Sequence, residues 1–189
     1  MDKLAHLSTF VSLIYGLGVA NVLAHLARLI KHGSRADWYW VHTLWSLNLL
    51  LMMASFWWVL QNWATVPRIG YLNYLTMLLV PCFLLLASDL LFPTPDGTGK
   101  VDLNAHFFKV RKPFFLCVIG VVAADELDSL QKGWEHVRAL GPYYWGTQPV
   151  WWLMCLVGMH SDRERVHAAL VLLNLLLFAG GMINALAYV

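Results

Sequence analysis

Three carboxylates stand where an apolar run ends, within the segment 112–132. The run 114–124 is followed at once by Asp125, Glu126 and Asp128. Carboxylates are costly inside a membrane, and those that occur there mark ion paths or proton relays. On a helix Asp125 and Asp128 share a face, and Glu126 points about 100° away. Two carboxylates on one face can concentrate cations or accept protons, so Asp125 and Asp128 are candidate site residues.

Two of the candidate carboxylates also have a structural interpretation. Lys132 follows Asp128 by four residues, the spacing of an acid–base pair on a solvated helix end. Asp89, in another apolar run, either belongs to a pathway or reaches the cytoplasmic surface towards Arg28. Asp125 lies deepest in its run, and the sequence offers no comparable explanation for it.

Further polar side chains recur at helical spacing inside the apolar segments. Hydrocarbon offers no hydrogen-bond partners, so we expect these side chains to face one another within a bundle. They either bond neighbouring helices or line a hydrated path, and the sequence leaves both interpretations open. The candidate pathway residues are Asn21, His25, Asn48, Asp89, Asp125, Asp128, Asn174 and Asn184.

Small residues at helical spacing predict close contact between helices, as small-xxx-small patterns do in membranes. The residues assigned to helix packing are Gly16, Ala20, Ala24, Gly180 and Gly181.

The composition predicts an all-α, polytopic transmembrane bundle. Of 189 residues 59% are hydrophobic and only 13% are charged, too little charge to solvate a soluble domain. A helix needs about 20 apolar residues to cross a bilayer, and six segments approach that length. The fifth is short and contains Pro149, so five spans are the fallback. The predicted spans are 8–30, 41–63, 71–92, 113–130, 144–159 and 166–188.

The chain divides into two three-span halves, 1–92 and 113–189, joined by a cytoplasmic loop and interfacial helix at 93–112. Pro113 then falls in the first turn of the fourth span, where proline is tolerated. Sliding the chain by 104 places Phe10 on Phe114 and Gly16 on Gly120. This weak internal similarity is compatible with two inverted halves, an arrangement known in transporters.

Nine of the 13 Lys and Arg residues fall in the first, third and fifth loops. The positive-inside rule therefore places both termini outside. Trp38 and Trp40 at one end of the second span, and Trp57, Trp58 and Trp63 at the other, predict an interfacial belt. A tryptophan-lined ligand site is the alternative.

Several functional classes find no support in the sequence. The net charge of +2 is too small and scattered for nucleic acid binding. Motifs of P-loop enzymes, serine hydrolases and zinc proteases are absent. His25 and His167 leave haem ligation as a minor alternative. We therefore expect that the chain is not an enzyme, that it has no catalytic residue, and that it binds no metal and no cofactor.

Three short patterns stand out: F-x-x-x-I-Y-G-L-G at 10–18, L-L-F-P at 90–93 and D-L-x-A-H-F-F-x-x-R-x-x-F-F at 102–115. In these patterns the chain resembles an uncharacterised group of small multi-span bacterial membrane proteins. The resemblance implies residence in the lipid bilayer of a bacterial inner membrane, and it brings no known activity.

The first functional interpretation is a small channel- or transporter-like bundle for a cation, a proton or a small polar solute. A bundle of 189 residues has few helices with which to enclose a path. We therefore expect a homo-oligomer. The alternative is a non-transporting sensor or accessory subunit, whose polar stripes pack against a protein partner that docks on the basic 93–112 loop. The same basic residues also fit anchoring to anionic lipid.

Overall fold

The computed structural model describes residues 3–31, 36–66, 68–93 and 101–187 and is almost entirely helical there, so the all-α prediction is confirmed. In chain order the elements are α1 (Lys3–Lys31), β1 (Ala36–Asp37), α2 (Trp40–Val59), the 3-10 helix η2 (Leu60–Thr65), α3 (Tyr71–Leu91), β2 (Val101–Asp102), α4 (Leu103–Gln131), α5 (Trp134–Ala139), α6 (Gly141–His160) and α7 (Glu164–Ala187).

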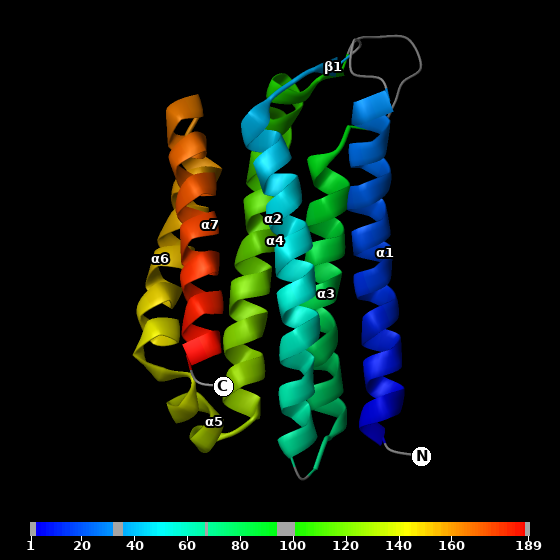
Figure 1. Cartoon of the computed structure of the whole chain (residues 1–189), viewed down its shortest axis with the longest axis vertical. Coiled ribbons are helices and arrows are strands. Elements are labelled where there is room, and N and C mark those ends of the chain that lie inside the picture. Colours follow the sequence, from blue (N-terminus) through cyan, green and yellow to red (C-terminus); the bar gives the residue numbers. More distant parts are fainter. Residues whose placement is uncertain (1–2, 32–35, 67, 94–100, 188–189) are drawn as a thin grey trace.

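The long helices stand side by side in one bundle (Figure 1). α1 lies at one edge and packs mainly on α3, whereas α6 and α7 lie at the opposite edge against α4 and α2. Each long helix has 20–29 residues, or roughly 30–44 Å at 1.5 Å per residue. That length matches the hydrocarbon core of a bilayer. β1 and β2 pair in parallel and tie two connecting segments together at one end.

Four helices of the described ranges are long and apolar enough to cross a membrane: α1, α2 with η2, α3 and α7. This agrees with a membrane protein and falls short of the six predicted spans. α4 and α6 run beside these helices and are not among the four. The basic start and acidic end of α4 lower its mean hydropathy. Six crossings and inverted halves therefore stay predictions.

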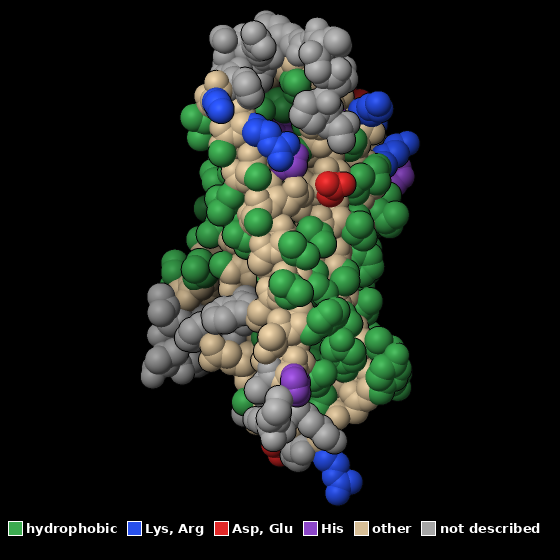
Figure 2. Space-filling view, turned by 90° about the vertical axis from the view of Figure 1, so that its right-hand side faces the viewer, with side chains coloured by type: hydrophobic (Ala, Val, Ile, Leu, Met, Phe, Trp, Pro, Cys, Tyr) green, Lys and Arg blue, Asp and Glu red, His purple; other side chains and the backbone are tan. Residues whose placement is uncertain are grey.

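The surface of the bundle is apolar along its middle. In Figure 2 hydrophobic side chains are spread along the middle of the visible face, while Lys and Arg lie near its ends. Large side chains such as Leu13, Leu72 and Leu176 are well exposed. Exposed apolar side chains in such number mark contact with lipid or with another protein, and they are compatible with insertion in a membrane.

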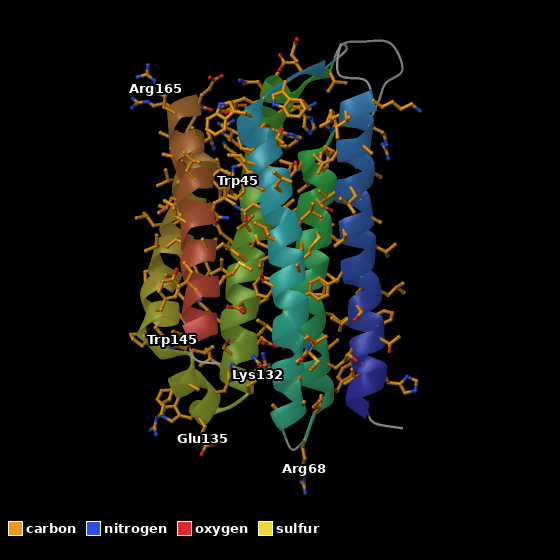
Figure 3. The ribbon with its side chains drawn as sticks, viewed as in Figure 1. Trp45, Arg68, Lys132, Glu135, Trp145 and Arg165 are labelled. Atoms are coloured by element: carbon orange, nitrogen blue, oxygen red, sulfur yellow. The ribbon has the colours of Figure 1, made fainter. Side chains whose placement is uncertain are left out.

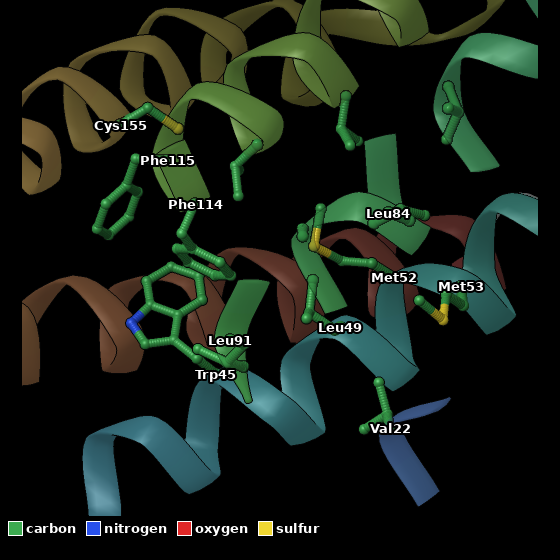
Figure 4. Close-up of a cluster of buried hydrophobic side chains, with 14 of the residues drawn as sticks. Val22, Trp45, Leu49, Met52, Met53, Leu84, Leu91, Phe114, Phe115 and Cys155 are labelled. Carbon is green, nitrogen blue, oxygen red and sulfur yellow. The ribbon is translucent and has the colours of Figure 1, made fainter. Parts of the chain in front are cut away.

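The core is built around aromatic rings and long aliphatic side chains between α2, α3 and α4 (Figure 4). Trp45 meets the rings of Phe114 and Phe115 edge to face, both at 5.4 Å between centroids. Glycine lets two helices approach where a ring needs room: a Cβ at Gly158 would stand 2.5 Å from Phe115, and one at Gly120 would stand 2.7 Å from Phe83.

The fourth helix differs most from its prediction. α4 begins at Leu103, and Asp102 caps it, since its Oδ1 accepts from the Ala105 N–H at 2.9 Å. The expected interfacial helix and the fourth span are therefore one continuous helix. Pro113 lies in its interior and not in a first turn, so the boundary placed between 112 and 113 falls within an element.

Two further differences concern the second half of the chain. The short helix α5 was not predicted, and Gly133, with φ of +102°, makes the turn that leads into it. α6 begins at Gly141 and continues through Pro149, so the fifth segment is a full helix of 20 residues. In packing, α4 contacts mainly α3 and α6, whereas α1 contacts mainly α3; the two halves are not packed alike.

Candidate functional site

The acidic residues of the last turns of α4 all receive hydrogen bonds from aromatic side chains of other elements. Trp63 of η2 donates to Asp128 at 2.7 Å, Tyr144 of α6 donates to Asp125 at 2.5 Å, and Trp152 of α6 donates to Glu126 at 2.8 Å. One helix end thus gathers donors from two other elements. Hydrogen bonds to an ionised acceptor are about twice as strong as neutral ones.

Asp128 is neutralised as the sequence predicted. The Lys132 Nζ forms an ion pair with its Oδ2, one helical turn away. The same ammonium lies 5.4 Å from the centre of the Trp63 ring, within the range of a cation–π contact. Trp63 is 1% exposed, so it is not part of the interfacial belt predicted for it. Asp128, Lys132 and Trp63 form a closed structural cluster that ties η2 to α4.

Asp125 has a different environment. The Tyr144 hydroxyl that binds it also lies 3.3 Å from the Ser129 Oγ. No ion pair neutralises Asp125 within the described ranges of the chain. Its side chain lines a cavity of about 90 Å³, here named the Asp125 cavity. The lining residues come from α2, α4, α6 and α7: Met52, Phe56, Val121, Val122, Asp125, Gln148, Trp151 and Phe178.

The Asp125 cavity is apolar apart from two side chains. Gln148, which is 8% exposed, supplies an amide, and Asp125 supplies the carboxylate. Trp151 and Phe178 meet edge to face, 5.9 Å apart, and form an aromatic corner. A carboxylate beside apolar walls binds a proton or a positively charged group more strongly than a fully hydrated carboxylate does. Neither Glu126 nor Asp128 lines this cavity.

The predicted amides lie at or inside the helix contacts. Asn21 is half-buried and donates to the Ser88 Oγ of α3 at 3.1 Å. Asn48 is fully buried and Asn174 is 1% exposed. Each is one helical turn from a residue that lines the Asp125 cavity, Met52 and Phe178 respectively. The side chain of Asn184 lies outside the described residues.

Asp89 and the small residues of α1 lie on the exposed surface of the bundle. Asp89 is exposed, and the structure does not bring it to the Asp125 cavity. Gly16, Ala20 and Ala24 are also exposed and face away from the neighbouring helices.

Gly180 and Gly181 lie against the ring of Tyr143 of α6, and a Cβ at Gly180 would collide with the Tyr143 hydroxyl. That hydroxyl donates to the Leu177 carbonyl at 2.6 Å. The second small-residue pair therefore serves the contact between α6 and α7.

Two histidines donate hydrogen bonds to the last carbonyl groups of α3. The His42 Nε2 donates to the Leu91 carbonyl at 2.9 Å, and the His106 Nε2 donates to the Leu90 carbonyl at 3.1 Å. These carbonyls have no partners within their own helix. His25 stacks on Phe92, which follows them, at 4.5 Å. Burial lowers the pKa of His106, with Lys109 adding to the effect.

The two histidines considered for haem have separate contacts. The His25 Nδ1 bonds the Asn21 carbonyl of its own helix at 2.8 Å, whereas the His167 Nε2 donates to the Ser161 carbonyl at 2.9 Å. His167 is otherwise surrounded by the rings of Phe107, Phe108 and Phe115. Within the described ranges no three His, Cys, Asp or Glu side chains gather as a metal-binding group.

Tyr144, Gln148 and Trp151 were missed in the sequence. Gln148 carried a usable signal, since it is a polar residue inside an apolar segment. Tyr144 and Trp151 are aromatic residues in an aromatic-rich helix, and their spacing to Asp125 along the chain holds no regularity that reveals the contact.

The chain was compared with family models, curated proteins and solved structures. None of the three comparisons gives a match. Function is therefore inferred from the geometry of the Asp125 cavity.

Proposed function

We propose that the chain is a multi-pass protein of a bacterial inner membrane that carries a proton, a cation or a small polar solute, with Asp125 as the residue that binds it. The position of Asp125 is the observation that supports this role. Its carboxylate lines a cavity between four helices and lacks the lysine partner that Asp128 has. An ionisable group inside a membrane bundle marks a functional site by default.

Six crossings, with both termini outside, are part of the proposal. α1 begins and α7 ends at the same end of the bundle (Figure 1), as an even number of crossings requires. Basic residues gather at the other end, in the last turn of α1, the first turns of α4 and the start of α7. Figure 3 shows Arg165 there, with Arg68 and Lys132 at the opposite end. The excess of basic residues supports a cytoplasmic location for that end.

Proton flux into liposomes tests the role of Asp125. The protein is reconstituted with a pH-sensitive dye inside the vesicles, and a potassium gradient with valinomycin supplies the potential. We expect Asp125→Asn to abolish flux and Glu126→Gln to retain it, because Trp152 can still donate to the glutamine oxygen. Thermal unfolding of each variant serves as the control that the bundle is intact. Unchanged flux in Asp125→Asn would refute the assigned role.

A non-transporting accessory subunit is the second candidate. The exposed face of Gly16, Ala20 and Ala24 favours it, because such faces accept a partner helix closely. A homo-oligomer through the same face is the corresponding proposal for the transporter. A protein that is inactive in the flux assay and co-isolates from native membranes with one fixed partner would favour the accessory role.

A further inference from the structure

The wall of the Asp125 cavity combines one carboxylate with aromatic rings. Phe56, Trp151 and Phe178 contribute three aromatic side chains from three helices, and Met52 adds a polarisable thioether. Aromatic faces attract cations, most strongly where water is excluded. The chemistry of this wall therefore restricts which cation it can hold.

The lining residues offer too few oxygen ligands for a hard metal cation. Calcium and magnesium require about six or more oxygen ligands, and the side-chain oxygens among the lining residues belong to Asp125 and Gln148 alone. A bare proton would need the carboxylate but neither the space nor the rings. An organic cation uses all three features, because its N–H groups donate to oxygen while its carbons contact rings and aliphatic side chains.

The volume sets the size of the guest. About 90 Å³ is less than the roughly 150 Å³ of an engineered apolar cavity that holds benzene, so the cavity favours a guest smaller than a benzene ring. Dimethylammonium has three heavy atoms, one positive charge and two N–H donors. Its donors match the Asp125 carboxylate and the Gln148 amide oxygen, and its methyl groups match the aromatic corner of Trp151 and Phe178.

We infer that the Asp125 cavity binds a small alkylammonium ion, with Asp125 as the counter-ion and Trp151 and Phe178 as the aromatic wall. This inference rests on the proposed function and names the ligand class of the same site. The carboxylate supplies the opposite charge, and the aromatic side chains supply apolar and cation–π contact. Tetraethylammonium is too large, and ethanol, which also has three heavy atoms, lacks the charge.

Isothermal titration of the protein in lipid nanodiscs with dimethylammonium tests the inference. We expect saturable binding, weaker by roughly tenfold or more in Asp125→Asn, which loses a charged hydrogen-bond acceptor. Phe178→Leu should weaken binding roughly fivefold or more through loss of the ring face. Glu126→Gln, outside the cavity, should bind as the unmodified protein does. Phe178→Leu keeps the test valid if Asp125→Asn fails to fold.

The outcomes separate the ligand class from the proposed function. Failure of dimethylammonium to bind, or equal binding of ethanol, sodium or tetraethylammonium, overturns the alkylammonium inference. Equal affinity in all variants overturns it as well. If proton flux still depends on Asp125 in that case, the proposed function stands without this ligand. If the protein binds dimethylammonium through Asp125 and Phe178 but shows no proton flux, the ligand class is supported and the transport function is refuted.

Discussion

The neighbouring carboxylates Asp125 and Asp128 differ in how their charges are compensated. Asp128 has an ammonium and an indole N–H, whereas Asp125 has a phenol hydroxyl and a cavity. Removing one partner of a buried charged pair is costly, because the remaining charge stays buried. We therefore expect the two sites to respond differently to substitution: Asp128 in stability and Asp125 in function.

Trp63→Phe should destabilise the bundle by about 1.5–3 kcal/mol, because Asp128 loses a hydrogen bond to a charged acceptor. The measurement is reversible unfolding in mixed micelles. Trp38→Phe is the matched control, since Trp38 is 57% exposed, and it should change the unfolding free energy by less than about 0.5 kcal/mol. Equal effects of the two substitutions would mean that the indole N–H of Trp63 contributes nothing.

Among the elements, the fit between α4 and α6 depends on Gly158. A Cβ there would stand 2.5 Å from the Phe115 ring, so Gly158→Ala should cost about 1–3 kcal/mol through overpacking. Gly146→Ala on the same helix meets no atom within 4 Å and should be neutral or stabilise by up to about 1 kcal/mol. The same micelle unfolding assay measures both, and a destabilised Gly146→Ala with a neutral Gly158→Ala would reverse the assignment.

The end of α3 should be sensitive to acid through His106. Burial lowers the pKa of His106 in the folded protein, so the unfolded chain binds the proton more readily. Its contribution to stability is complete above the unfolded pKa of about 6.5 and declines as the pH falls below that value. His106→Gln should therefore show a shallower loss of stability between pH 7 and pH 5. At pH 8 the two proteins differ only by the hydrogen bond to Leu90, and an unchanged acid slope would argue against the histidine.

The sequence predicted the helices better than their contacts. Apolar length located five of the long helices closely, and the i,i+4 spacing predicted the pair of Asp128 and Lys132. The start of α4 was wrong because Pro113 resembled a first-turn proline. The Asp125 cavity could not be predicted beyond Asp125 itself. Its wall depends on how α2, α6 and α7 rotate about their axes, which side-chain packing decides.

At the scale of the whole molecule, we propose that the excess of basic residues at one end of the bundle orients it in the membrane. Arg165 and Arg68 lie at opposite ends of the bundle (Figure 3), and both are exposed. In a background without the native cysteines, Arg68→Cys should react in intact cells with a membrane-impermeant maleimide. Arg165→Cys should react only after the cells are opened. Labelling of both positions from one side would contradict the transmembrane arrangement.

We propose above all that Asp125 is an accessible carboxyl group in a cavity inside the membrane. Reaction with dicyclohexylcarbodiimide, an apolar carboxyl reagent that enters the bilayer, tests it most directly when the modified residue is identified by mass spectrometry. We predict modification at Asp125, protection by dimethylammonium, and no modification in Asp125→Asn. Modification at Glu126 or Asp128 with Asp125 left untouched would contradict the claim.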